Sequence, residues 1–228
     1  EDKGSAQIKT CIILSALNTH GTTKIKAVKS RDHTELMLKS LNYPIQIKSE
    51  KKYDLIKING MKQFKSFDYN VPGDISSASF FIVLTLLSKN SELLIKNINV
   101  NPTRIGVINI LNIMNSKIEV LNKKNYKGEQ IGDIRVKSKV KFQSINCETS
   151  LNSSAIDEFL LIFLVACKSN GVSRFKNLEE LNKKESPRLN LAIKFMKMIG
   201  IKVTKNKNDI KIYGNPKLIL KKNYHIKN

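Results

Sequence analysis

The stretch FLLIFLVAC, Phe159–Cys167, contains no charged or strongly polar side chain. A helix of this composition has no face suited to water, so the sequence predicts that it is buried on every side. The stretches CIILSAL (Cys11–Leu17) and SFFIVLTLL (Ser79–Leu87) have the same character. All three are far shorter than the about 20 residues that a membrane-spanning helix needs. We therefore expect three interior helices of a globular protein that does not bind membranes.

Each apolar stretch begins a similar succession of elements, which recurs at intervals of about seventy residues. The succession is an apolar helix, a strand, an amphipathic helix and a pair of strands. The expected bounds are, in the first unit, Ser5–Asn18, Thr23–Val28, Arg31–Leu41 and a hairpin within Ile45–Ile58; in the second, Asp74–Ser88, Glu92–Ile98, Thr103–Asn115, Lys117–Leu121 and Ile131–Val136; in the third, Ala155–Lys168, Val172–Phe175, Pro187–Ile199, Lys202–Thr204 and Ile210–Tyr213. The chain is therefore predicted to be built from three structural repeats.

The second helix of a unit differs from the first in its pattern. In PRLNLAIKFMKMIG, Pro187–Gly200, apolar side chains recur at helical spacing and charged ones fall between them. Such a helix is covered on one side only. Sheets that lie outside and wrap buried helices would explain both patterns. An ordinary α/β sandwich with buried crossover helices is the alternative architecture.

The chain is strongly basic. Its 228 residues include 40 Lys and Arg against 19 Asp and Glu, which gives a net charge of +21. This charge favours an anionic partner: nucleic acid, a membrane surface or a small phosphorylated ligand. The lysines are scattered and Trp is absent, so platforms for stacking nucleic-acid bases are few. A small phosphorylated ligand is therefore preferred, with a basic nucleic-acid-binding protein as an alternative.

The cysteines and histidines do not form a metal-binding motif. Cys11, Cys147 and Cys167 are far apart, and the three histidines are equally scattered. Cys11 and Cys167 lie in apolar stretches, which predicts buried free thiols in a reducing cytoplasm. We expect no metal site and a cytoplasmic protein.

Polar clusters stand where several of the predicted helices begin. They read GSAQIK (Gly4–Lys9), KSRDHTE (Lys29–Glu35), SSAIDE (Ser153–Glu158) and KKESPRL (Lys183–Leu189). Helix N-termini expose unpaired N–H groups and a partial positive charge, which suits phosphate or carboxylate. Ser and Thr in these clusters are equally explained as local helix caps, and acidic residues as partners of the helix dipole. With Lys9, Arg31, Lys184 and Arg188 added, the clusters predict a pocket for a doubly anionic ligand.

Asp157 differs from the other polar residues of these clusters. It lies where a wholly apolar helix is expected to begin, and a carboxylate at such a border is costly unless it is paired or used. This position favours a functional role for Asp157.

Several motifs together resemble the 5-enolpyruvylshikimate-3-phosphate synthase family, also called 3-phosphoshikimate 1-carboxyvinyltransferases. The motifs SAQIK, SRDHTELML, PGDISSASFF, NPTRIG, GEQIGDIRV, AIDE and KKESPRL stand in the family's order and approximate spacing across essentially the whole chain. The resemblance implies an inside-out α/β barrel fold, α/β or α+β in class, made of βαβαββ repeats with buried inner helices. It also implies that 1–70 is the last unit of a first domain and 71–228 most of a second, so that the chain resembles a fragment lacking both ends.

The resemblance further implies a reaction. The family transfers the enolpyruvyl group of phosphoenolpyruvate to the 5-hydroxyl of shikimate 3-phosphate, in aromatic amino acid biosynthesis, without metal or cofactor. The active site lies between the two domains, so a fragment is expected to be inactive alone, and the full-length protein is expected to be a monomer. The related enolpyruvyl transferase acting on UDP-N-acetylglucosamine shares the fold and is an alternative.

Residues of this chain take on the family's roles where its motifs match. The substrate-binding set is Ser5, Ala6, Gln7, Arg31, Asp157, Lys184 and Arg188. The catalytic set is Asp157 as acceptor of the hydroxyl proton, Glu185 as an acid or base, and Lys184. Pro187 stands where the family usually has Asp; we expect it to open the helix with Ser186 as its N-cap.

Overall fold

The computed structural model describes residues 4–138 and 141–219. The first unit contains α1 (Ala6–Leu17), β1 (Thr22–Val28), α2 (His33–Ser40), β2 (Ile45–Ser49) and β3 (Tyr53–Asn59). The second contains α3 (Ile75–Leu87), β4 (Glu92–Asn99), α4 (Gly106–Ile113), β5 (Ile118–Tyr126) and β6 (Glu129–Lys137). The third contains α5 (Phe159–Cys167), β9 (Val172–Phe175), α6 (Arg188–Met198), β10 (Lys202–Asn206) and β11 (Asp209–Tyr213). The predicted succession of elements is confirmed in all three units.

The three sheets share one topology. Their strand orders are β1-β3-β2, β4-β6-β5 and β10-β11-β9, all antiparallel, so the last strand of each unit lies in the middle. Between the second and third units, β7 (Phe142–Gln143) and β8 (Ser169–Asn170) form a short parallel pair. Two 3-10 turns, η1 (Thr149–Leu151) and η2 (Glu179–Asn182), precede α5 and α6. The repeat in the sequence therefore corresponds to a repeat in connectivity.

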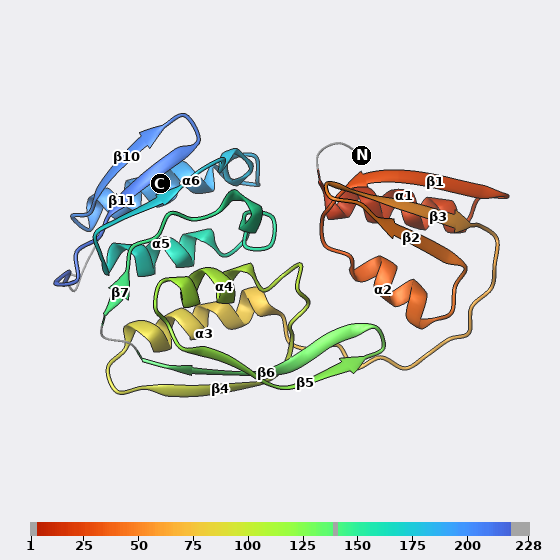
Figure 1. Cartoon of the computed structure of the whole chain (residues 1–228), viewed down its shortest axis with the longest axis horizontal. Coiled ribbons are helices and arrows are strands. Elements are labelled where there is room, and N and C mark those ends of the chain that lie inside the picture. Colours follow the sequence, from red (N-terminus) through yellow and green to blue (C-terminus); the bar gives the residue numbers. More distant parts are fainter. Residues whose placement is uncertain (1–3, 139–140, 220–228) are drawn as a thin grey trace.

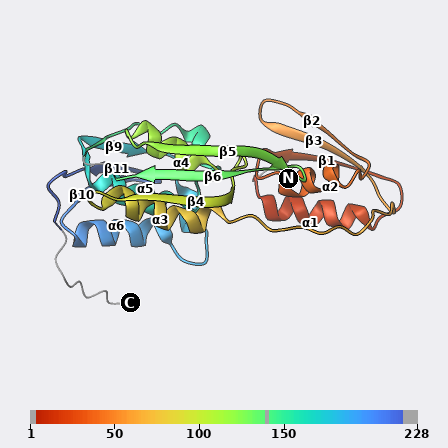
Figure 2. The same ribbon diagram turned by 90° about the horizontal axis from the view of Figure 1, so that it is seen from below.

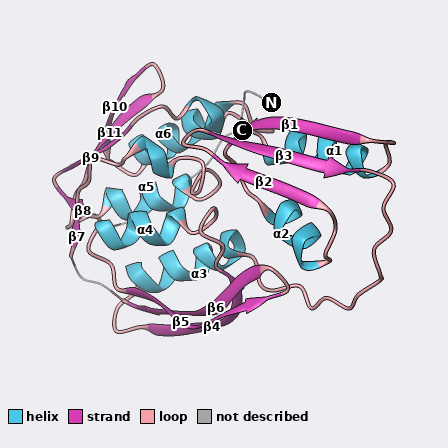
Figure 3. Ribbon diagram, turned by 45° about the vertical axis from the view of Figure 1, so that its right-hand side comes forward, coloured by secondary structure: helices cyan, strands magenta, loops and turns pink. Residues whose placement is uncertain are grey.

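The sheets lie on the outside and the helices between them. In Figure 1 and Figure 3, α3, α4 and α5 lie between the β4–β6 sheet and the β9–β11 sheet. One buried apolar cluster runs through the second and third units, and a separate, smaller one fills the first unit. Figure 2 shows the first unit beside the other two rather than inserted between them. The described residues thus form two separate hydrophobic cores.

The three inner helices differ in how completely they are buried. No residue of α5 is exposed, because it packs against α3, α4, α6 and β11. In α3, however, Phe80, Phe81 and Leu84 are exposed, and in α1 so are Ile8 and Leu14. Burial on every side was predicted from composition, and it is correct for α5 and wrong for α1 and α3. Helix α1 packs mainly on β1 and β3 and is joined to α2 by the Lys9–Glu35 ion pair, and in the described part of the chain its remaining face stays exposed.

The cysteines of α1 and α5 differ in burial in the same way as their helices. Cys167 in α5 is buried, and Cys11 in α1 is exposed, so the prediction of a buried thiol is wrong for Cys11. Burial raises the pKa of the Cys167 thiol to about 12. Among the described residues, no helix is long and apolar enough to cross a membrane, and no three potential metal ligands gather in one place.

Several helices begin later than their sequences suggest. Before α5, the backbone N–H of Glu158 donates to the carbonyl of Ala155, so this stretch forms tight turns and α5 starts at Phe159. Before α4, the Asn101 side chain accepts from the N–H of Thr103, and α4 starts at Gly106. Local side-chain and 3-10 hydrogen bonds compete with the first helical turn. These irregular stretches carry the polar residues that meet between the units.

Candidate active site

The carboxylate of Asp157 lies at the centre of a cluster of cations. Arg31 Nη2 donates to Oδ2, and Arg188 Nη1 donates to Oδ1 at 3.2 Å. Lys184 Nζ lies 3.7 Å from Oδ1, and Arg104 Nη1 lies 3.8 Å from Oδ2. Four cations therefore surround one carboxylate whose side chain is 26% exposed.

This surrounding charge determines the ionisation of Asp157. Burial raises the pKa of its carboxyl, but the hydrogen bond and charge of Arg31, with the charges of Lys184 and Arg104, lower the pKa below its ordinary value. Asp157 is consequently an anion at neutral pH.

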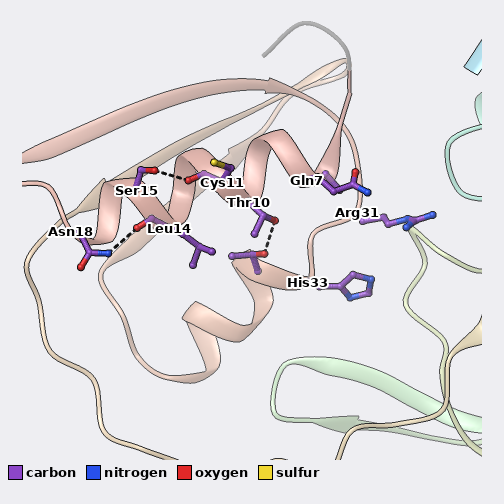
Figure 4. A pocket seen from close by; sticks show the side chains of 10 residues that line it. Gln7, Thr10, Cys11, Leu14, Ser15, Asn18, Arg31 and His33 are labelled. Atoms are coloured by element: carbon purple, nitrogen blue, oxygen red, sulfur yellow. Dashed lines mark hydrogen bonds between the residues drawn. The ribbon is translucent and has the colours of Figure 1, made fainter. Parts of the chain in front are cut away.

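The cluster brings together segments that are distant along the chain. Arg31 comes from the loop between β1 and α2, and Asp157 immediately precedes α5. Lys184 follows η2, and Arg188 is the first residue of α6. Figure 4 shows the Arg31 side chain pointing away from the first unit and toward a neighbouring segment. The site therefore lies between the first unit and the rest of the molecule.

A cavity of about 310 Å³ opens at this junction. The first unit and the opposite side both line it, with Gly4, Ser5, Ala6, Gln7, Ser30, Arg31, Ser153, Ile156, Glu180, Lys183 and Lys184. Ser5 is the N-cap of α1, and its Oγ accepts from the N–H of Ile8 at 3.3 Å. The Ser5 hydroxyl therefore has a structural role as a helix cap. The first turn of α1 also lines the cavity. Its N–H groups and the cations suit an anion.

A second cavity, of about 740 Å³, runs along α1 (Figure 4). Gln7 and Arg31 lie at one end of it, and Asn18 at the other. Beneath this surface the buried Lys9 Nζ lies 2.6 Å from Glu35 Oε1 and joins α1 to α2. Lys9 was expected to contact a ligand, but its side chain is fully buried in this ion pair. Lys9 therefore links the first turns of α1 and α2 inside the first unit.

The stretch KKESPRL divides into surface and site residues. Lys183 Nζ lies 2.6 Å from Glu179 on the surface, whereas Lys184 points toward Asp157. Glu185 Oε2 accepts from Arg188 Nη2 at 2.8 Å, and its side chain is 83% exposed. A hydrogen bond with its own backbone N–H, followed by Arg188, lowers the pKa of the Glu185 carboxyl. Only part of this charged stretch faces the cluster.

Pro187 occupies a different place in the helix from the one predicted. It stands at the N-cap position and α6 begins at Arg188; Pro187 makes no side-chain cap bond, and Asn182 Oδ1 accepts from the N–H of Asn190 in the first turn at 3.3 Å. The prediction that Ser186 is the N-cap is therefore wrong, because Pro187 holds that position. The Ser186 carbonyl accepts from the N–H of Arg188 at 2.8 Å. Proline nevertheless leaves Arg188 at the helix start, from which it reaches Asp157.

Comparison with known proteins decides the family. The model of the EPSP synthase (3-phosphoshikimate 1-carboxyvinyltransferase) family matches residues 1–227. The chain belongs to the EPSP synthase family. The 3-phosphoshikimate 1-carboxyvinyltransferase of Petrotoga mobilis is 38% identical over 216 residues, which are 94% of this chain and 49% of that protein. That of Legionella pneumophila (strain Corby) is 37% identical over 200 residues, 87% of this chain and 45% of that protein.

Solved structures agree with this membership. An EPSP synthase from Acinetobacter baumannii superposes with a TM-score of 0.82 at 33% identity, covering 95% of this chain and 48% of that one. The enolpyruvyl transferase NikO from Streptomyces tendae matches with a TM-score of 0.63 at 15% identity, which shows a common fold. The predicted inside-out α/β fold of enolpyruvyl transferases is confirmed. The chain spans about half the length of the curated EPSP synthases that it matches.

The structure adds residues to the candidate site that the sequence reasoning did not assign. Arg104, from the motif NPTRIG, donates to Asp74 Oδ1 at 3.0 Å and to Ser76 Oγ at 2.5 Å. Glu158 is buried and accepts a hydrogen bond from Ser76. Burial raises the pKa of the Glu158 carboxyl, although Ser76 and Arg104 oppose this. The motifs were visible in the sequence, but nothing there indicated that PGDISS, NPTRIG and AIDE meet.

Ser30 is another residue that the sequence reasoning missed. It precedes Arg31 and lines the 310 Å³ cavity. Its Oγ is buried and has no hydrogen-bond partner among the described residues. A buried hydroxyl without a partner carries a desolvation cost, which a bound anion would remove.

Proposed function

We propose that this chain forms part of an enzyme that transfers the enolpyruvyl group of phosphoenolpyruvate to the 5-hydroxyl of shikimate 3-phosphate. One observation carries the proposal. Three segments of a chain in the EPSP synthase family bring Arg31, Lys184 and Arg188 onto the carboxylate of Asp157, beside a cavity between two hydrophobic cores. Both substrates carry a phosphate and a carboxylate, and guanidinium and ammonium groups bind such anions.

The proposed division of the chain follows the two cores. Residues 1–70 would be the last βαβαββ unit of one domain, and 71–228 most of the other. The separation of the buried clusters supports this boundary, as does the stretch 60–72, which contains no helix or strand. The substrates would then bind between domains, with Ser5, Ala6 and Gln7 contributing the start of α1.

In the proposed chemistry Asp157 is the proton acceptor. The 5-hydroxyl oxygen forms a bond to C2 of phosphoenolpyruvate, its proton passes to Asp157, and the methylene carbon takes up a proton from an acid. Phosphate then leaves, and the methyl group loses a proton to restore the double bond. Glu185 is assigned the acid and base role at the methylene carbon. Its exposure and its contact with Arg188 suit a group that turns inward when a substrate occupies Arg188.

Lys184 and Arg188 are assigned to the anionic groups, Lys184 to shikimate 3-phosphate and Arg188 to phosphoenolpyruvate. Fixed cations lower the barrier when charge develops on a bound phosphate or carboxylate, because they are already in position. The free thiols support the further proposal of a cytoplasmic enzyme. We propose that the complete enzyme is a monomer that requires neither nucleic acid nor a membrane.

The decisive experiment measures phosphate release from phosphoenolpyruvate in the presence of shikimate 3-phosphate. In a full-length enzyme that contains this chain, Asp157→Ala and Lys184→Met should each lower kcat by about a hundredfold or more. Lys197→Met is the matched control, because Lys197 is an exposed lysine of α6 that lines neither cavity, and it should leave kcat unchanged. A normal rate in the Asp157→Ala enzyme would refute its assigned role.

The 228-residue chain should release no phosphate alone, since it spans only about half of its relatives. Replacing shikimate 3-phosphate by UDP-N-acetylglucosamine tests the related transferase activity in the full-length enzyme. A gel shift with nucleic acid at low and moderate salt tests the basic-protein alternative. Binding that weakens steeply with salt would favour that alternative over the enzyme.

A further inference from the structure

The first unit contributes two short segments to the lining of the 310 Å³ cavity. One is 4–7, which leads into α1, and the other contains Ser30 and Arg31, which precede α2. The candidate ligand residues of the first unit all lie in these two segments. They can form one binding surface only if the starts of α1 and α2 keep a fixed position relative to each other.

The apolar core of the first unit holds the far halves of these two helices. Its residues in α1 fall between 12 and 17, and its residue in α2 is Leu38. In the first half of α1, all of which the structure describes, Lys9 is the only buried residue. In the first half of α2 it is Glu35. A pair of opposite charges therefore occupies the place that apolar side chains take farther along both helices.

The Lys9–Glu35 pair is closed off from solvent. The two side chains are 0% and 3% exposed, and Lys9 Nζ lies 2.6 Å from Glu35 Oε1. Glu35 Oε2 is also buried and has no hydrogen-bond partner among the described residues. Moving two charges out of water is costly, and a buried pair is often no more stabilising than apolar side chains of the same volume. Stability alone does not account for such a pair, whereas the relative position that it imposes on two helices does.

Each member of the pair lies close to a candidate ligand residue. Lys9 follows Ser5 by one helical turn, and its backbone N–H donates to the Ser5 carbonyl at 3.0 Å. Glu35 follows Arg31 by four residues, in the first turn of α2. The ion pair therefore joins the two cavity-lining segments directly behind the residues that line the cavity.

A hydrogen bond next to the ion pair joins the same two helices. Thr10 follows Lys9, Thr34 precedes Glu35, and the two Oγ1 atoms lie 2.8 Å apart. Figure 4 shows Thr10 making this bond from α1. Both threonines are only partly buried and line the 740 Å³ cavity. Two adjacent polar contacts, one buried and one nearer the surface, thus connect the first halves of α1 and α2.

We propose that Lys9 and Glu35 are positioning residues for shikimate 3-phosphate. By joining α1 to α2, the pair holds segment 5–7 in a fixed position relative to Arg31. Neither side chain can itself contact a ligand, since both are buried. The arrangement lies wholly within the first unit. The effect on the ligand rests on the proposed function, whereas the alignment of the two helices does not.

Replacement of both charges separates position from stability. In a full-length enzyme that contains this chain, Lys9→Met/Glu35→Leu fills similar space without charge, so the midpoint of urea denaturation should stay close to that of the wild type. Calorimetric titration should nevertheless show weaker binding. If the aligned arrangement falls to about a tenth of the population, the Kd for shikimate 3-phosphate should rise about tenfold. The kcat should change far less than the KM, because the pair does not contact the reacting groups.

Two further kinds of variant test the link itself. Lys9→Met alone and Glu35→Leu alone should each lower the urea midpoint more than the double variant does, because each leaves one buried charge without its partner. Thr10→Val removes the neighbouring hydrogen bond at a partly exposed position, where folding is not at risk. It should raise the Kd in the same direction by a smaller factor, and it keeps the test decisive if the double variant does not fold.

A matched control pair exists on the surface of the same unit. Lys48→Met/Glu50→Leu replaces the same residue types, whose Nζ and Oε1 atoms lie 3.7 Å apart and which line neither of the two cavities. Its Kd and kcat should equal those of the wild type. An unchanged Kd in both Lys9→Met/Glu35→Leu and Thr10→Val would overturn the proposal, as would an equal rise in the control.

Hydrogen exchange measures the alignment without a ligand. In the double variant the amide of Lys9, in the first half of α1, should exchange faster than in the wild type. The amide of Ala16, which the apolar core holds in place, should keep its rate. Unchanged exchange at both amides would contradict the alignment. If the wild-type enzyme does not bind shikimate 3-phosphate, the proposed function fails, and hydrogen exchange still decides whether the pair aligns the helices.

Discussion

Helices α3 and α5 have nearly the same composition but different surroundings. Both are rich in large apolar side chains and carry no charged residue, and each is the inner helix of its unit. Phe163 of α5 is 1% exposed and contacts the rings of Phe159 and Phe175. Phe81 of α3 is 59% exposed. Composition therefore indicates that a helix belongs in an interior, whereas the neighbouring elements decide how many of its sides are covered.

The beginnings of the two helices differ as well. Asp74 caps α3, since its Oδ2 accepts from the N–H of Ser77 at 2.8 Å. The start of α5 has no side-chain cap, and the acidic pair Asp157–Glu158 faces Arg104 and other site residues instead. Asp74 caps its helix as well as contacting Arg104, whereas neither Asp157 nor Glu158 makes a cap bond to α5. Exchange of equivalent residues between these helices makes the difference measurable.

The largest difference is expected in the bodies of the helices. Phe163→Ala should lower the free energy of unfolding by about 3–5 kcal/mol, because it leaves a cavity in a closed core. Phe81→Ala should change it by less than about 1 kcal/mol, since most of that ring is already exposed. Urea denaturation of both variants gives the comparison. Equal losses would mean that α3 is as fully covered in solution as α5.

A smaller difference is expected in the pH dependence of Asp157 and Glu158. The pKa of Asp157 is lowered from 3.8, so its stabilising effect is present above that value and is lost as the pH falls through the folded-state pKa. The pKa of Glu158 is raised from 4.5, so its favourable contribution is present below that value and is lost as the pH rises through the folded-state pKa. The two neighbours should therefore have opposite effects.

Asp157→Asn and Glu158→Gln remove these contributions one at a time. The deficit of Asp157→Asn relative to wild type should shrink as the pH is lowered below 3.8, and Glu158→Gln should gain stability relative to wild type as the pH rises above 4.5. Each change should not exceed about 1.4 kcal/mol per pH unit, the limit for one proton. Slopes of the same sign in unfolding measured from pH 3 to 7 would contradict the assigned environments.

The smallest effect is expected at the cap of α3. Asp74→Ala should lower the free energy of unfolding by about 1 kcal/mol, because it removes an N-cap bond and the 3.0 Å contact with Arg104. Asp74→Asn, which keeps the acceptor, should recover most of this loss. If Ala and Asn behave alike, the charge of Asp74 matters and its capping does not.

Much of the fold could be predicted because it depends on local pattern. Hydrophobic periodicity indicated the elements of three repeats. The starts of α4 and α5 were misplaced because local side-chain or 3-10 bonds replace helical ones there. The exposure of α1 and α3 could not be predicted, because periodicity reports what a helix contains and not what lies beside it.

The candidate site was predictable to a similar extent. The sequence alone, through its motifs, determined the family and predicted the candidate site residues, including Arg31, Asp157, Lys184 and Arg188. Only the tertiary structure decided that these four side chains converge, that Lys9 is buried in an ion pair, and that Asp32 and His33 reach Asn101 and Glu129. The physical reason is the distance along the chain over which the interactions act. Side-chain chemistry and hydrogen bonding within a turn depend on neighbours in sequence. Burial, pKa and contacts between units depend on atoms from distant positions, 126 apart for Arg31 and Asp157 and 69 apart for Asp32 and Asn101.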